Sequence, residues 1–136
     1  MNLRLGCTVK QCNGSMTIEI IENNKVLYIG KDLPEGPLDI ICDIQWPTVL
    51  TINLSNKNPS DTEIVNGNIT KDKAIILENI SINNFPLGTR IIEQLVNDII
   101  YWGFNGTVTM SFTEKNPTRW LLKMKNIFDM KRLLWN

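Results

Sequence analysis

SMTIEIIENNKVLYI (residues 15–29) is the stretch that decides the class of fold. Apolar and polar side chains alternate along residues 15–22 and again along residues 25–29, which is the period of a β-strand with one buried face. The ENNK sequence between them carries two asparagines, and asparagine tolerates the backbone conformation of a tight hairpin turn. The stretch therefore predicts two antiparallel strands joined by a hairpin.

Five further segments show the same alternation. They are LRLGCTV (3–9), PLDIICDI (37–44), TVLTINLS (48–55), AIILENISIN (74–83) and TVTMSFTE (107–114). Short gaps that contain Asn, Gly or Pro separate most of these segments, as in all-β domains. We therefore predict a mainly β protein, an antiparallel β-sandwich of jelly-roll-like type, with one core built by residues 3–84 and completed by residues 107–114.

Within residues 74–83, strict alternation divides the side chains between two faces of the strand. One face carries Ile76, Glu78, Ile80 and Ile82. The other face carries Ile75, Leu77, Asn79 and Ser81. We expect Ile80 and Ile82 to point into the core.

Two segments near the C-terminus have the spacing of a helix. In TRIIEQLVNDIIYW (89–102), apolar residues recur every three or four positions after Thr89, a residue type that caps helices well. We predict a helix there, with a bulged sandwich strand as the alternative. After Pro117 the composition changes again, so the chain divides into a sandwich domain (1–116) and a short helical tail (117–136).

The tail at residues 117–136 is amphipathic and cationic, because five basic residues outnumber the single acid Asp129. We expect it to pack on its own sandwich or on a neighbouring subunit, and binding to a membrane surface is the alternative. The residues expected to contact a partner are Arg119, Trp120, Lys123, Met124, Ile127 and Phe128.

Composition and charge weigh against several classes of function. Fourteen basic and fourteen acidic residues cancel, so the overall charge does not attract the chain to a nucleic acid or an anionic membrane. No histidine occurs in the sequence, which removes the commonest general base and every histidine-based zinc site and weighs against an enzyme. Cys7, Cys12 and Cys42 lack the spacing of a metal knuckle, and we expect buried free thiols.

The hydropathy pattern bears on where the protein is made. The N-terminus MNLRLGCTVKQCNG has no apolar region typical of a secretory signal. No later stretch approaches the ~18 apolar residues that cross a bilayer. We therefore expect synthesis in the cytoplasm and no membrane span.

The polar segment NKNPSDTEIVNGNITKDK (56–73) is a candidate calcium site. Calcium takes six to eight oxygen ligands, which carboxylates, amides and main-chain carbonyls supply. The same residue types fill ordinary turns, so a plain connecting loop is the alternative that composition favours. If a metal binds here, the expected ligands are Asn56, Asp61 and Asp72.

Residues 15–87 contain a succession of motifs that resembles the calcium-dependent, xylan-binding type of carbohydrate-binding module. A strand ending LTINLSNK is followed by a polar loop, KDK and the strand IILENISINN with an asparagine turn. The resemblance implies that Asn56 and Asp72 match two of the family's calcium ligands. Lys57 stands where the family has an acid, and an ammonium repels a divalent cation at close range. The resemblance is therefore compatible with a retained fold and a lost metal.

The later stretch YWGFNGTVTMSFTEKNPTRWLLKMKNIF (101–128) resembles the C-terminal part of small virion proteins of tailed bacteriophages. The leading hypothesis is a non-enzymatic component of a virion tail, baseplate or neck that assembles with other virion proteins. It would be made in the host cytoplasm and end in the virion.

The alternative hypothesis is a carbohydrate-binding module that recognises host-surface glycan, directly or through calcium. Sugars stack on exposed aromatic rings, and Trp46, Tyr101 and Trp102 are the candidates, although each such residue is more often part of a core. An enzyme ranks third. Asp61 and Asp72 could form a glycosidase pair, but a chain with fourteen acids contains such pairs by chance.

Overall fold

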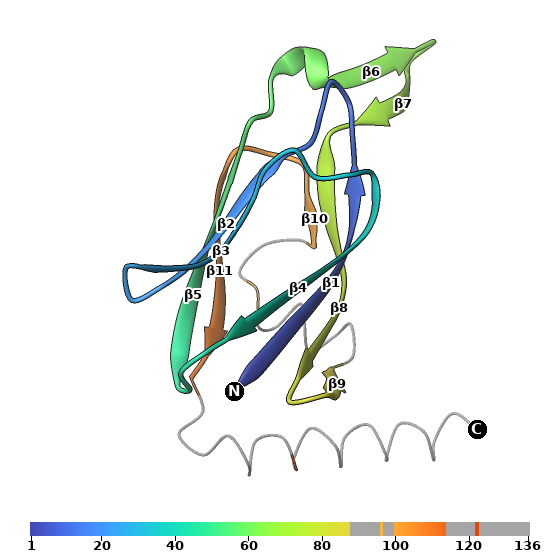
Figure 1. Ribbon diagram of the computed structural model, residues 1–136. Coiled ribbons are helices and arrows are strands. Elements are labelled where there is room, and N and C mark those ends of the chain that lie inside the picture. The colour runs from blue at the N-terminus through green and yellow to red at the C-terminus, as the bar shows by residue number, and fades with distance from the viewer. Residues whose placement is uncertain (88–95, 97–99, 114–121, 123–136) are drawn as a thin grey trace, which may run out of the picture.

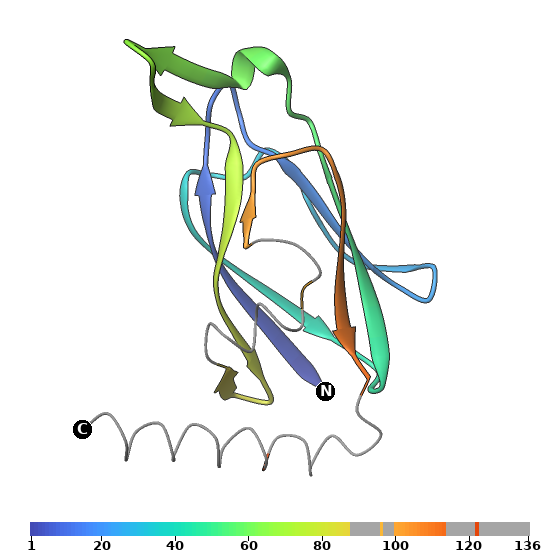
Figure 2. The same ribbon diagram turned by 180° about the vertical axis from the view of Figure 1, so that it is seen from behind.

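A computed structural model of the chain describes residues 1–87, 96, 100–113 and 122, and these residues form mainly antiparallel β-sheet (Figures 1 and 2). Sheet A contains β1 (Asn2–Lys10), β4 (Gly36–Asp43), β8 (Ala74–Ile82), β9 (Phe85–Leu87) and β10 (Tyr101–Trp102). Sheet B contains β2 (Thr17–Glu22), β3 (Lys25–Gly30), β5 (Thr48–Ser55) and β11 (Gly106–Phe112). A separate hairpin consists of β6 (Thr62–Val65) and β7 (Asn68–Asp72).

The strand order is β10-β8-β1-β4 in sheet A, where β9 also pairs with β8, and β11-β5-β2-β3 in sheet B. All seven segments predicted as strands lie in these sheets, which confirms the mainly β, antiparallel fold. The predicted turn between β2 and β3 is also confirmed, because Asn23 and Asn24 have φ angles of 48° and 63°. Two consecutive residues with positive φ give the turn that matches the twist of a hairpin.

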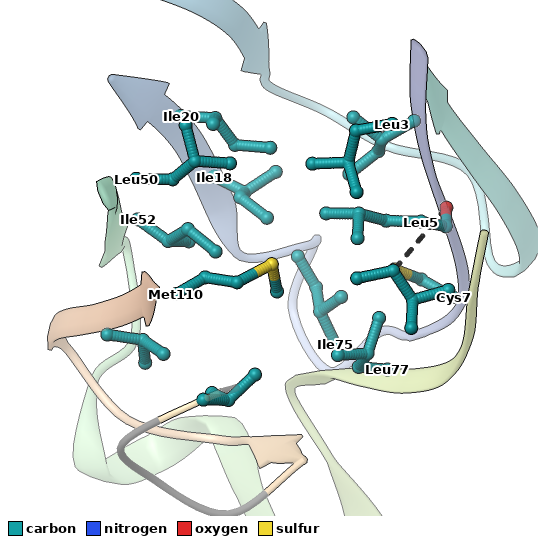
Figure 3. Close-up of a cluster of buried hydrophobic side chains, with 14 of the residues drawn as sticks. Leu3, Leu5, Cys7, Ile18, Ile20, Leu50, Ile52, Ile75, Leu77 and Met110 are labelled. Carbon is teal, nitrogen blue, oxygen red and sulfur yellow. Dashed lines mark hydrogen bonds between the residues drawn. The ribbon is translucent and has the colours of Figure 1, made fainter. Parts of the chain in front are cut away.

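The two sheets enclose one hydrophobic core in a sandwich-like arrangement. Figure 3 shows leucines and Cys7 of β1 and β8 pointing toward isoleucines and Leu50 of β2 and β5. Fully burying one such side chain stabilises the fold by roughly 1.5–3 kcal/mol. Val108, Met110 and Phe112 of β11 belong to the same core, as the predicted role of residues 107–114 requires. The three cysteines are buried and free, as expected.

A β-bulge in β8 corrects the predicted division of its side chains. Leu77 pairs with Cys7 and Asn79 pairs with Gly6. Glu78 is therefore an extra residue of β8 that has no partner of its own between Gly6 and Cys7 of β1. The extra residue shifts the alternation by one position. Ile80 and Ile82 are buried, as predicted, and so are Ile75 and Leu77, which strict alternation had placed on the other face.

Gly6 gives the bulge its room. A Cβ atom at Gly6 would lie 2.3 Å from Oδ1 and 2.8 Å from Cγ of Asn79, which no real side chain accepts without a shift. The absence of a side chain at Gly6 therefore leaves room for the side chain of Asn79 at the bulge.

The predicted helix at residues 89–102 is wrong where the structure describes it. Tyr101 and Trp102 pair with Ile76 and Ile75 as strand β10, and Val96 forms an isolated bridge with Met110. A short apolar run fits either period, and here pairing with β8 decided the outcome. The other residues of 89–99, and the tail apart from Leu122, lie outside the described residues. Over the described part of the chain, no helix is long and apolar enough to cross a membrane.

We predict that Gly6→Ala destabilises the protein only while Asn79 is present. The double-mutant cycle of Gly6→Ala and Asn79→Ala, followed by chemical denaturation, should give a coupling free energy of about 1 kcal/mol, because the two side chains compete for one space. Additive effects of the two substitutions would contradict the proposed role of Gly6.

Candidate functional site

The segment predicted as a polar loop contains a projecting hairpin. After β5 the chain forms a 3₁₀ turn, η1 (Pro59–Asp61), and then strands β6 and β7, which stand beyond the ends of both sheets (Figures 1 and 2). Asn66 and Gly67 form its turn with φ angles of 52° and 79°. Asn-Gly favours this type of hairpin turn because both residues tolerate positive φ. The prediction of a loop without strands was therefore wrong over residues 62–72.

Lys57 and Asp72 form a largely buried ion pair at the base of the hairpin. Lys57 Nζ lies 2.7 Å from Asp72 Oδ1, and the two side chains are 14% and 12% exposed. The same ammonium donates a hydrogen bond of 2.6 Å to the carbonyl oxygen of Gly103. Tyr101 Oη donates to Asp72 Oδ2 at 2.6 Å, and Thr62 Oγ1 donates to Oδ1 at 2.8 Å. These contacts join the ends of β5, β6, β7 and β10.

A second ion pair lies beside the first. Lys73 Nζ is 3.0 Å from Asp61 Oδ2, and both side chains are almost fully buried. The ammonium also donates to the main-chain oxygen of Asn56 at 2.9 Å. The carboxylate accepts hydrogen bonds from the amide of Asn58 at 2.7 Å and from the side chain of Asn13 at 3.1 Å. Each buried charge therefore has an opposite charge and further hydrogen bonds, which is the condition for burying it.

The titration of these groups reflects their partners. Burial alone would raise the pKa of Asp72, but hydrogen bonds from Lys57, Tyr101 and Thr62 outweigh burial and lower it to about 2. Burial and the hydrogen bond to Asp72 raise the pKa of Tyr101 to about 12. The amide of Asn58 and then the ammonium of Lys73 lower the pKa of Asp61. All three groups keep one protonation state over the physiological range.

The structure brings the three predicted calcium ligands to one end of the molecule, where they contact lysine ammonium groups. Asn56 contributes its main-chain oxygen to Lys73, which also holds Asp61, while Asp72 is held by Lys57. Within the described ranges, no group of three or more Cys, Asp and Glu side chains is arranged to hold a metal ion. A calcium ion would have to displace both ammonium groups from their carboxylates.

The three candidate aromatic residues do not form one sugar platform. Trp102 is completely buried in the core, so it has no ring face to offer a ligand. Trp46 lies in the β4–β5 connection, at the opposite end of the sheets from the hairpin, and packs on Phe112 with ring centroids 5.2 Å apart. Tyr101 is partly exposed, and Lys10 Nζ lies 5.6 Å from its ring centroid.

Two adjoining hollows of about 210 and 250 Å³ lie between the hairpin and the β1–β2 loop. Gln11, Glu35 and Lys71 line both hollows, and Tyr101 and Asp72 line the first. Their walls are mostly polar and carry charges of both signs. Of the predicted sugar-binding residues, Tyr101 is the one that reaches this region.

Sequence reasoning missed Lys73 and Asn105 as parts of the site. Asn105 binds the main chain of Lys57 twice, by accepting from its amide at 3.0 Å and donating to its carbonyl at 2.7 Å. The KDK motif places Lys73 next to Asp72, but Lys73 pairs with Asp61 instead, so the motif alone does not reveal its role. No local signal points to Asn105, because its partner is 48 positions away.

The predicted partner residues between Arg119 and Phe128 lie outside the described residues. Comparison of the chain with family models, with curated proteins and with solved structures finds no match. The two resemblances noted in the sequence therefore stay predictions.

We predict that Asp72→Asn lowers the free energy of unfolding by about 2–3 kcal/mol, because it leaves the ammonium of Lys57 buried without its counter-charge. Asp39→Asn is the matched control. Asp39 also lies 2.7 Å from a basic group, Arg4, but both side chains are 52% exposed, so the melting temperature should stay nearly unchanged. Equal effects of the two substitutions would show that the Lys57–Asp72 pair has no special role.

The same pair predicts a defined loss of stability in acid. The pKa of Asp72 is lower in the folded chain, about 2, than its ordinary value of 3.8. Its contribution, about 1–2 kcal/mol after allowing for solvent screening, is therefore complete above about pH 5 and is lost as the pH falls from about 4 to 2. Denaturant titrations at several pH values should show a shallower loss for Asp72→Asn than for the wild type. An identical acid slope would contradict the assignment.

We expect weak calcium binding or none, because the metal must compete with Lys57 and Lys73 for the carboxylates. A metal that binds only the folded state raises its melting temperature. Calorimetry and thermal melts of chelator-treated protein should therefore show little or no effect of added calcium. Micromolar affinity that Asp72→Asn removes would establish the calcium site instead.

Proposed function

We propose that the chain is a non-enzymatic structural component of a bacteriophage virion, in its tail, baseplate or neck. It assembles with other virion proteins through the faces of its sheets, its projecting hairpin and its C-terminal segment. The observation that carries the proposal is the hairpin, because it presents apolar side chains to solvent from a base held by buried ion pairs and hydrogen bonds.

Three aliphatic residues of the hairpin are exposed to solvent. Ile64, Val65 and Ile69 are 62%, 47% and 64% exposed. Ile64 and Ile69 are direct cross-strand partners, so their side chains form one apolar surface. Contiguous exposed apolar surface marks sites of protein interaction.

The anchoring of the hairpin supports the same conclusion. A two-stranded hairpin alone is marginally stable in water. Here Thr62 at the start of β6 and Asp72 at the end of β7 are tied together and to Lys57 and Tyr101. The ion pairs thus serve to hold an apolar element away from the two sheets, which is a structural role.

Charge and the C-terminal segment are consistent with assembly. A net charge of zero gives no overall repulsion between closely packed copies. The apolar side chains predicted in residues 118–136 exceed what one short helix leaves in water, and Leu122, the residue of this segment that is described, is 57% exposed. Aromatic residues dominate many interfaces, so Trp120 and Phe128 are the expected anchors.

Recognition of a glycan is the second candidate function. The polar hollows beside Tyr101 favour it, because sugar sites combine several hydrogen-bonding groups with an aromatic ring. On this hypothesis the isolated monomer binds glycan in calorimetry, and Tyr101→Ala removes the binding.

The proposal predicts that purified particles of the bacteriophage that encodes this sequence contain the chain in a fixed number of copies. Changing Trp120 and Phe128 to Ala should abolish incorporation, since these residues are assigned to the interface, while the melting temperature of the isolated chain stays nearly unchanged. Quantitative mass spectrometry of the particles and a thermal melt provide the two measurements. Absence of the chain from particles, or a large loss of monomer stability with incorporation intact, would contradict the proposal.

A further inference from the structure

The outer faces of the two sheets differ in chemistry. The outward positions of sheet A carry charged side chains along their length. They are Arg4, Lys10, Asp39, Asp43 and Glu78. Among the outward positions of sheet B that the structure describes, Glu19 is the one ionisable side chain. The solvent-facing side of an antiparallel sheet normally carries polar and charged residues, as the outer face of sheet A does.

The outer face of sheet B is aliphatic and rich in threonine. Ile21 pairs with Val26 on one side and with Thr51 on the other, which places the three side chains in one row. Ile29 lies in the neighbouring row beside Glu19, and Val49 lies on the adjacent β5. Val26, Ile29 and Val49 are 49%, 49% and 46% exposed. We call the outward surface formed by these residues the sheet B face.

The sequence supplies a complementary partner in residues 118–136. This segment carries apolar residues at helical spacing together with five basic residues and one acid. Among the described residues, the sheet B face offers aliphatic surface and one carboxylate, Glu19, while the exposed Lys25 and Lys31 lie at the two ends of β3. The negative charge between them suits a cationic segment. The described chain leaves sheet B through β11, whose last residue Phe112 pairs with Thr48 beside Val49.

We infer that residues 118–136 of one copy dock on the sheet B face of a second copy. This inference rests on the proposed function. Each copy then has one donor segment and one acceptor face, which is a head-to-tail contact that builds rings or open arrays. Trp120 and Phe128 would lie on Val26, Ile29 and Val49, with the basic residues of the segment toward Glu19.

Two full-length variants test the inference by complementation. The face variant, Val26→Lys with Ile29→Lys, keeps its own segment but repels an incoming one. The segment variant, Trp120→Lys with Phe128→Lys, keeps its own face. Lysine is well tolerated on an edge strand such as β3, and a melt of each variant checks folding. If the first pair does not fold, Val49→Lys replaces it. Ile41→Lys is the matched control, because Ile41 is 59% exposed on the outer face of sheet A.

Analytical ultracentrifugation over a series of protein concentrations should give a different association state for each sample. The wild type and Ile41→Lys should form species larger than the monomer, while either variant alone should associate more than about tenfold more weakly. An equal mixture of the two variants should form a dimer, because one productive contact remains. A wild type that stays monomeric, a mixture that stays monomeric, or an equal loss in Ile41→Lys would overturn the inference. None of these outcomes touches the proposed function, which incorporation into particles decides separately.

Discussion

The buried pair of Lys57 and Asp72 is the interaction on which the hairpin end of the molecule depends. Taking both charges out of water is costly, and the cost is offset only because Tyr101, Thr62 and the carbonyl of Gly103 complete their hydrogen bonds. These partners come from segments that are far apart in the chain. Closing the pair therefore brings together the end of β5, both strands of the hairpin and β10, and it sets the place from which the hairpin projects.

Much of the fold could be predicted because it depends on local patterns. The alternation in residues 15–29 and the two asparagines between them are enough for the β2–β3 hairpin, and Ile80 and Ile82 lie in the core as expected. The bulge at Glu78 could not be predicted from β8 alone, because it depends on Gly6 in the neighbouring strand. The prediction of a helix where β10 lies failed for a similar reason. The sequence fits the helical and the strand period equally, and pairing with β8 decides between them.

The sequence singled out the three candidate calcium ligands and the opposing charge of Lys57, but it did not show which carboxylate pairs with which lysine. Asn56, Asp61 and Asp72 do come together, and a positive charge does lie at each carboxylate, but it is the ammonium of Lys73 or Lys57. Resemblance pointed to a metal, and the lysines supply its electrostatic role from within the chain.

We infer that the ammonium groups of Lys57 and Lys73 neutralise the acids at the base of the hairpin without a bound metal. The most direct test is an NMR titration of the Asp72 carboxyl carbon in the folded protein with a calcium chelator present. We predict a pKa of about 2, well below the ordinary value of 3.8, because Lys57, Tyr101 and Thr62 all hold the ionised form. A pKa at or above 3.8 in the absence of metal would contradict the account.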